Sequence, residues 1–179
     1  MAEHLKEEIT KDTATMVDYV INVRRVTKVT KGGKRFAFSA LVVVGDKSGK
    51  VGIAQGKSRE VSAAIAKATN RAQKNLVQIP LRGATVPYNV IGKHGSSTVL
   101  IRPAYKGTGV IAGGAVRSIM EALGVKDVLA KSMGSSNRMN VVKATLNALA
   151  KLRSLKHIAA TRGKSTEQIV KGSHGNSIK

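Results

Sequence analysis

Residues 35–45 alternate apolar side chains with others, and this pattern constrains the fold more than any other feature of the sequence. Because successive side chains of a strand point to opposite faces, the alternation predicts a β-strand with one buried face. The apolar residues that share this face are Phe36, Phe38, Ala40, Val42 and Val44. The chain has only two Phe and three Tyr, and no Trp. We therefore expect an aliphatic core in which both phenylalanines are buried.

The residues around this strand predict a β-β-β-α unit. Residues 19–30 are rich in Val, Ile and Thr and are typical of a strand, and the turn at 46–49 leads into a short strand at 50–54. Ser58 is placed to cap the N-terminus of a helix that runs to about Leu76. The apolar side of this helix carries Val61, Ile65, Ala68, Ala72 and Leu76. Its basic side, which either contacts RNA or faces solvent, carries Lys67, Arg71 and Lys74.

A second unit with the order β-β-α-β-α is expected beyond Pro80. Its strands are expected at 77–90, 97–102 and 128–133, and its helices from the glycines at 107–114 to Leu123 and from 140 to about 152. Gly124 is placed as the residue that ends the first of these helices. The predicted fold class is therefore α+β with two small domains, which a chain of 179 residues allows.

The expected domain organisation has four parts. An acidic N-terminal extension (1–18) precedes the first domain (19–80), and the second domain (81–155) is followed by a basic tail (156–179). The acidic start is unlike a secretory signal or an Arg-rich transit peptide, and no apolar run approaches the roughly 18 residues of a membrane span. We therefore expect a cytoplasmic protein without a membrane partner.

Positive charge dominates the sequence and lies on its patterned parts. The chain carries 31 Lys and Arg against 10 Asp and Glu, a formal net charge of +21. Residues 1–18 hold two basic and five acidic side chains, residues 19–80 thirteen and two, and residues 81–153 eleven and two. Such an excess predicts a polyanionic partner, because each neutralised phosphate releases counterions. The distribution favours binding by the folded units over binding by a tail.

Two glycine motifs come close to nucleotide-binding signatures without matching them. Gly56-Lys57-Ser58 lies between a strand and a helix, but only three residues separate Gly52 from Gly56, where a P-loop has four. The segment 107–112 fits G-x-G-x-x-A, yet Asp127, twenty residues after the first glycine, precedes a strand instead of ending one. Helix entry and close packing are the favoured use of these last glycines. Lys57 is favoured as a nucleic-acid phosphate contact near a helix N-terminus.

Two other motifs resemble parts of RNA-binding modules. Residues 90–95 contain the G-x-x-G of KH domains, whose loop joins two helices, but here strand-forming residues flank it and a β-hairpin is favoured. Phe36 and Phe38 are two residues apart, as are the base-stacking aromatics of RNA-recognition sheets. The face that they share with Val42 and Val44 favours burial instead.

Neither a catalytic site nor a metal site is expected. Between residues 19 and 153 the acidic residues are Asp46, Glu60, Glu121 and Asp127, and no pattern pairs them for acid–base chemistry. The four histidines are far apart in the sequence, and the chain has no cysteine for thiol catalysis, disulfides or zinc. We therefore predict no cofactor and no enzymatic activity.

Several segments resemble the family of bacterial ribosomal protein five of the small subunit. The likeness covers about residues 20–170 and is strongest at 33–52, 56–61, 107–115, 128–131, 140–145 and 162–165. Two departures are visible. Residues 52–56 (Gly-Ile-Ala-Gln-Gly) lack the aromatic residues usual in the family, and Arg138 stands where Pro is common.

The resemblance implies a fold and a role. It implies an N-terminal domain like double-stranded-RNA-binding domains, followed by a β-α-β-α domain with a left-handed crossover. It also implies a structural protein that binds small-subunit rRNA, helps to hold head to body and supports translational accuracy near the path by which mRNA enters. The implied neighbours are ribosomal proteins four and eight, with Gly109, Gly113 and Arg117 on the segment that faces protein four. The alternative is a free-standing regulator that binds nucleic acid reversibly.

The predicted rRNA-binding residues centre on the loop at 27–35, which the resemblance identifies as the family's RNA-contacting loop. Its cations surround Gly32 and Gly33, which let the backbone approach a partner closely. A solvated hairpin tip is the alternative interpretation of the same residues. The loop cations are Lys28, Lys31, Lys34 and Arg35, and the next candidates are Arg24, Arg25, Lys57 and Arg59.

Overall fold

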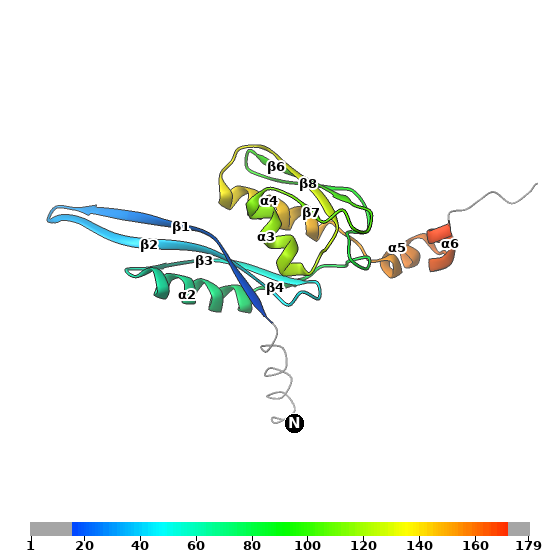
Figure 1. Ribbon diagram of the computed structural model, residues 1–179, viewed down its shortest axis with the longest axis horizontal. Coiled ribbons are helices and arrows are strands. Elements are labelled where there is room, and N and C mark those ends of the chain that lie inside the picture. The colour runs from blue at the N-terminus through cyan, green and yellow to red at the C-terminus, as the bar shows by residue number, and fades with distance from the viewer. Residues whose placement is uncertain (1–15, 172–179) are drawn as a thin grey trace, which may run out of the picture.

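A computed structural model describes residues 16–171, so most of the predicted acidic extension and the last eight residues lie outside the described part (Figure 1). The first unit is an antiparallel sheet with the strand order β1-β2-β3-β4 and one helix, α2. Its elements are β1 (Val17–Thr30), β2 (Gly33–Gly45), β3 (Lys50–Ser58), α2 (Val61–Lys74) and β4 (Leu76–Gln78). The three predicted strands and the helix are confirmed, and β4 was missed.

The second unit is a mixed sheet with the order β5-β6-β8-β7, in which β7 runs parallel to β8 and the other pairs are antiparallel. Its elements are β5 (Val90–His94), β6 (Ser97–Pro103), β7 (Val110–Ile111), α3 (Gly114–Leu123), β8 (Val128–Gly134) and α4 (Arg138–Ala150). Gly124 ends α3 with a φ of 83°, as predicted. The segment 77–90, predicted as a strand, instead contributes β4 to the first sheet and then a loop.

Two helices follow where the sequence predicted a weakly patterned polar tail. They are α5 (Leu155–Arg162) and α6 (Thr166–Lys171). The Ser154 side chain accepts a hydrogen bond from the His157 N–H at 3.2 Å and so caps α5, and Gly163 ends it with a φ of 61°. Ser at the first position and Gly at the last are residue types that favour helix ends.

The elements stack in four layers (Figure 1). Helix α2 covers one face of the first sheet through Ala64, Ala68 and Ala72. Helices α3 and α4 lie between the other face of that sheet and the second sheet. The mixed α+β class is confirmed. The likeness to double-stranded-RNA-binding domains and the hand of the β7–α3–β8 crossover stay predictions.

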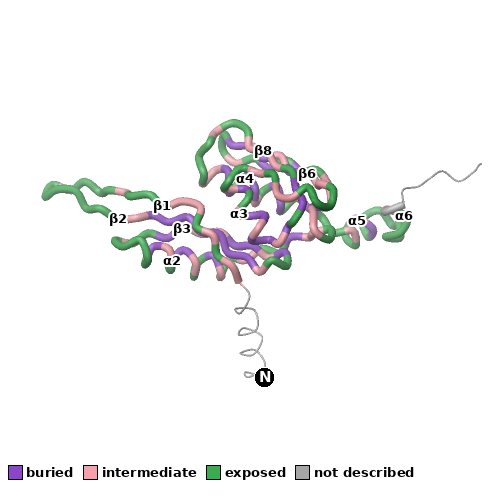
Figure 2. The backbone as a smooth tube through the Cα atoms, viewed as in Figure 1, coloured by how far each residue is buried: buried purple, intermediate pink, exposed green. Residues whose placement is uncertain are grey.

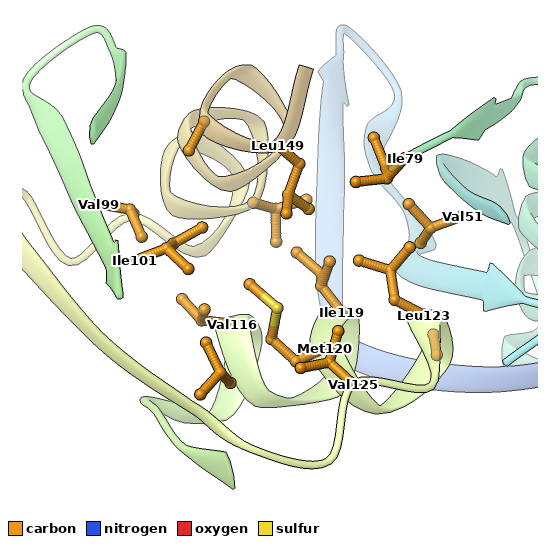
Figure 3. Packing of buried hydrophobic residues seen from close by; sticks show 14 of the residues in the cluster. Val51, Ile79, Val99, Ile101, Val116, Ile119, Met120, Leu123, Val125 and Leu149 are labelled. Carbon is orange, nitrogen blue, oxygen red and sulfur yellow. The ribbon is translucent and has the colours of Figure 1, made fainter. Parts of the chain in front are cut away.

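One hydrophobic core joins the two units (Figure 3). Val51 and Ile79 of the first unit pack in the same buried cluster as Val99 and Ile101 of β6. The side chains of α3, among them Met120, fill the space between them. Because this core is shared, the two sheets are held as layers of one body.

The turn after β2 fastens the first sheet to the end of α3. The N–H groups of Lys47 and Gly49 donate to the last carbonyls of α3, at Ala122 (3.0 Å) and Leu123 (3.1 Å). At Gly45 and Gly124 the two units approach so closely that a Cβ atom would overlap the backbone of Ala122 and of Lys47. These contacts satisfy carbonyl groups that a helix end leaves without partners.

Candidate nucleic-acid interface

The β1–β2 hairpin projects well beyond the rest of its sheet (Figure 1). Its projecting part, residues 23–36, is mostly exposed and closes through the pair Thr30–Gly33 around a two-residue turn (Figure 2). Gly33 has a φ of 126°, a conformation that side chains other than glycine rarely adopt, and no atom lies within 4 Å of where its Cβ would be. The predicted loop 27–35 is therefore the tip of a long β-ribbon with open space around its glycines.

The projecting part of the hairpin carries six of the predicted cations and no acid. No Asp or Glu occurs between residues 19 and 45. Residues paired across an antiparallel ladder lie on the same face, so the register assigns each cation to a side of the ribbon. Arg25 and Lys34 continue the face that α2 covers lower down, and Arg24, Lys28 and Arg35 continue the opposite face. With Lys31 in the turn, positive charge lies on both faces and at the tip.

Phe36 is exposed, which contradicts the predicted burial. Half of its surface (50%) is accessible, and the Arg25 guanidinium lies 4.9 Å from the centre of its ring. Phe38, one pleat nearer the core, is half-buried against the α2 cluster as predicted. The reason is the length of the hairpin, since α2 covers this face lower down and does not extend as far as Phe36. The stacked pair of ring and guanidinium presents flat, charged surface of the kind that stacks on nucleotide bases.

Lys57 lies in a strand, whereas the sequence predicted it in a loop at a helix N-terminus. Strand β3 continues to Ser58 because it pairs with β2 up to Phe38, and the helix is preceded by Glu60 instead of Ser58. Lys57 and Arg24 both pair with Ser39, from opposite sides, so they share one face. They are two strand spacings, or about 10 Å, apart. Arg59 follows the end of β3 and is exposed.

The basic side of α2 lies on the outer surface of the first unit. Lys67, Arg71 and Lys74 are exposed as predicted. Arg71 also donates from Nη1 to the Gln55 carbonyl at 3.2 Å, which ties it to β3.

Arg138 contacts strand β1, and the sequence analysis did not predict this contact. It begins α4, and its Nη1 donates to the Asn22 side-chain oxygen at 2.8 Å and to the Ile21 carbonyl at 3.4 Å. The acceptors lie where the pairing of β1 shifts register between Val20 and Asn22. Such a bulge bends a strand and exposes a carbonyl, and it has no reliable signal in sequence. The guanidinium thus ties the second unit to the base of the hairpin.

Of the residues predicted to face a protein partner, Gly113 and Arg117 lie at the start of α3 and Gly109 precedes β7. Gly113 precedes the helix and Arg117 is exposed on its first turn, where its N–H donates to the Gly113 carbonyl at 2.8 Å. The Gly109 carbonyl accepts from the Val128 N–H at 3.1 Å. Gly113 and Arg138 also border a hollow of about 400 Å³ between β1 and the N-terminal ends of α3 and α4.

The glycine motifs prove to be structural. Gly56 and Gly92 face the backbones of α2 and α4 so closely that a Cβ would overlap them, and residues 90–94 pair with β6 in the predicted hairpin. Asp127 is buried, and one of its carboxylate oxygens accepts from the N–H groups of Gly107 (2.9 Å) and Gly109 (3.0 Å). The prediction of close packing at these last two glycines is wrong, since no atom lies within 4 Å of their Cβ positions.

We expect Asp127→Ala to lower the free energy of unfolding by about 2 kcal/mol, because it removes a buried acceptor and leaves two part-buried loop N–H groups without it. Asp46 is a matched control, since its carboxylate accepts two N–H groups, from Ser48 and Lys50, in a half-exposed turn. Asp46→Ala should cost about 1 kcal/mol, because water replaces the lost acceptor. Urea denaturation followed by circular dichroism measures both. Equal losses would mean that burial of Asp127 adds nothing.

Two features are absent from the described part of the chain. Among residues 16–171, no group of three or more His, Asp or Glu side chains is placed to hold a metal ion. Within the same part of the chain, no helix is long and apolar enough to cross a membrane.

Comparison with known proteins agrees with this architecture. The family profile described as "Ribosomal protein S5, N-terminal domain" matches residues 16–80, and "Ribosomal protein S5, C-terminal domain" matches residues 92–162. The chain belongs to the ribosomal protein S5 family. The S5 profiles thus cover the first sheet with α2, and most of the second unit through α5.

Relatives within the S5 family are similar over almost their whole length. The "Small ribosomal subunit protein uS5" of Flavobacterium psychrophilum is 57% identical over 155 residues, which are 87% of this chain and 89% of the relative. The protein of the same name from Acidithiobacillus ferrooxidans is 53% identical over 155 residues, 86% of this chain and 88% of the relative. The family resemblance predicted from the sequence is therefore confirmed.

Proposed function

We propose that this protein is a structural component of the small ribosomal subunit, in the cytoplasm, and that it binds rRNA chiefly through the β1–β2 hairpin. Membership of the S5 family supports the ribosomal role, since the relatives are named as proteins of the small ribosomal subunit. The hairpin itself is the observation that carries the RNA-binding role. It extends six cations beyond the core, without an acid between residues 19 and 45.

Charge on both faces and at the tip favours insertion of the hairpin between RNA segments over adhesion to one flat surface. A ribbon lying on a single duplex would leave the cations of its other face without phosphates. Arg24, Lys28 and Arg35 would neutralise phosphates on one side, and Arg25 and Lys34 on the other. Lys57 and Arg59 would extend the contact toward the body of the first sheet. Gly32 and Gly33 would let the backbone of the tip approach RNA closely.

The same proposal includes a more specific role within the small ribosomal subunit and two neighbouring proteins. The role is support of the head-to-body junction, of translational accuracy and of the path by which mRNA enters, with ribosomal proteins four and eight as neighbours. A body of two sheets joined by one core and by the turn after β2 suits a rigid spacer between partners. The surface around Gly109, Gly113 and Arg117 is the proposed contact with protein four. The matched families and relatives are described as ribosomal proteins and not as enzymes, so we propose no catalytic activity.

A free-standing regulator that binds nucleic acid reversibly is the second candidate, because a basic surface alone serves either role. Sedimentation of a cell lysate separates the two. A structural component should co-sediment with small-subunit particles and remain there when the particles are purified at moderate salt. Protein found chiefly free of particles would contradict the proposal.

We expect that replacing Lys31 and Lys34 with Ala reduces the slope of log affinity for small-subunit rRNA against log salt by about two units, because two phosphate contacts are lost. Lys67 and Lys74 on α2 provide the control, since they too are exposed and their replacement removes the same charge. Filter binding at several salt concentrations measures both slopes. An unchanged slope in the hairpin variant would mean that the tip makes no contact with phosphate, whereas equal reductions in the two variants would add the basic side of α2 to the RNA contact.

A further inference from the structure

The second sheet has one face that nothing in the described chain covers. Side chains alternate along its strands, so that Val99, Ile101 and Val128 point to α3 and α4 and are buried. Their neighbours in sequence point the other way and are exposed or half-buried. We call this surface the outward face, and its residues are Ile91, Lys93, Thr98, Leu100, Arg102, Ile111, Leu129, Lys131 and Met133.

The register of the sheet intermixes aliphatic side chains and cations on the outward face. One cross-strand row is Ile91–Leu100–Lys131, a second is Arg102–Leu129–Ile111, and a third is Lys93–Thr98–Met133. Each row therefore contains one cation and at least one aliphatic side chain, and no row contains an acid.

The aliphatic residues of the outward face are unusually accessible. Ile111 is 53% exposed, Ile91 52%, Met133 44% and Leu129 38%. The solvated face of an antiparallel sheet ordinarily carries polar residues, and a contiguous apolar patch among charges marks an interaction surface. The outward face therefore has the composition of a surface that binds another molecule.

We propose that the outward face docks a protein surface that carries carboxylates among aliphatic side chains. The aliphatic residues would pack against their counterparts, and Lys93, Arg102 and Lys131 would each meet a carboxylate. This surface lies on a different sheet from the hairpin, so the inference goes beyond the proposed rRNA contact. It rests on the proposed function in that the partner is met within the particle, and the face adjoins the proposed contact with protein four because Ile111 lies between Gly109 and Gly113.

Two other occupants suit the outward face less well. RNA would find three cations but no aromatic side chain on which a base could stack, and the aliphatic rows would gain little from sugar and phosphate. A second copy of this chain, meeting the same face about a two-fold axis, would bring three cations against three. Charge complementarity therefore selects an acidic protein.

The absence of cysteine from the chain makes a direct test available. Leu129→Cys places one thiol on the outward face between Arg102 and Ile111, and Val61→Cys on α2 is a matched control because both native side chains are 38% exposed. Maleimide labelling should be at least tenfold slower for the Leu129→Cys variant in purified small-subunit particles than for the same variant free in solution. Labelling at the same rate in both states would overturn the proposal.

A benzophenone attached to the Leu129→Cys variant in particles identifies the occupant. Cross-linking to a protein segment rich in Asp or Glu and aliphatic residues is expected, whereas cross-linking to rRNA or to a second copy would overturn the proposal.

Leu129→Asp supplies an independent measurement, because it should be incorporated at least fivefold less than Val61→Asp when each competes with the unmodified protein during assembly. Equal incorporation of the two Asp variants would also overturn it. Failure of the unmodified protein to enter particles would instead contradict the proposed ribosomal role.

Discussion

Gly124→Ala is expected to lower the free energy of unfolding by about 3 kcal/mol or more, one of the largest effects that a single methyl group can have in this chain. Gly124 has a φ of 83°, which costs a residue with a Cβ about 1–2 kcal/mol. The added Cβ would also overlap the backbone of Lys47. That backbone cannot easily retreat, since the Lys47 N–H is bonded to the Ala122 carbonyl at 3.0 Å. The turn and α3 would have to separate.

Gly83→Ala is a control that measures the cost of a positive φ without the overlap with Lys47. Gly83 also has a positive φ, 61°, but no atom lies within 4 Å of its Cβ position, so this variant should lose only about 1–2 kcal/mol. Because the chain has no Trp, urea unfolding is best followed by far-ultraviolet circular dichroism. Equal losses in the two variants would show that the approach of the turn to α3 contributes no stability.

The contact at Gly124 matters because it fixes the relation between the two sheets. The shared core sets the distance between them, and the bonds from the turn to the end of α3 add directional restraint. Arg138 holds the base of the hairpin from the other side, through Asn22 and Ile21. The basic hairpin and the outward face of the second sheet are thus presented by one rigid scaffold, which is how a protein can hold RNA and a second partner in a set geometry.

Sequence periodicity predicted the long elements and failed at the short ones. The alternation at residues 35–45 and the apolar spacing in α2 extend over ten or more residues, so the pattern is distinct. Strands β4 and β7 have three and two residues, and neither is long enough to show a period. Their positions are decided by partners distant in sequence. The end of β3 was misplaced for the same reason, because pairing with β2 prolongs it past the glycine that resembled a loop.

The sequence predicted the charges of the candidate nucleic-acid interface, but it did not predict the shape of the hairpin that carries them. The cations of the hairpin are plain in the sequence, but their division between two faces depends on the register of β1 and β2. The scarcity of aromatic residues predicted that Phe36 is buried. This prediction is wrong because the β1–β2 hairpin extends beyond the end of α2, which covers only its base (Figure 1). The contact of Arg138 depends on a bulge, which arises from pairing and leaves no periodic trace.

Excision of the hairpin tip is expected to abolish most rRNA affinity while leaving the body folded. Removing residues 27–36 and joining Val26 to Ala37 through Asn-Gly preserves a native pair and closes it with a favoured two-residue turn. No buried side chain is removed, so the free energy of unfolding should change by less than about 1 kcal/mol. Four cations are lost, which should reduce the salt slope by about 3.6 units and the affinity at 0.1 M salt by more than about a thousandfold.

A full-length variant shows how much of this loss of rRNA affinity comes from the missing charges and how much from the missing shape of the hairpin tip. Replacing Lys28, Lys31, Lys34 and Arg35 with Gln keeps the ribbon and removes the same four charges. If phosphate contacts dominate, the two variants should lose similar affinity, because neutralisation of charge is what releases counterions. A Gln variant that binds distinctly better than the excised one would assign part of the affinity to Gly32, Gly33 and the stacked Arg25–Phe36 pair. Retention of near-native affinity by the excised protein would contradict a role for the tip and move the RNA contact to Arg24, Lys57 and the basic side of α2.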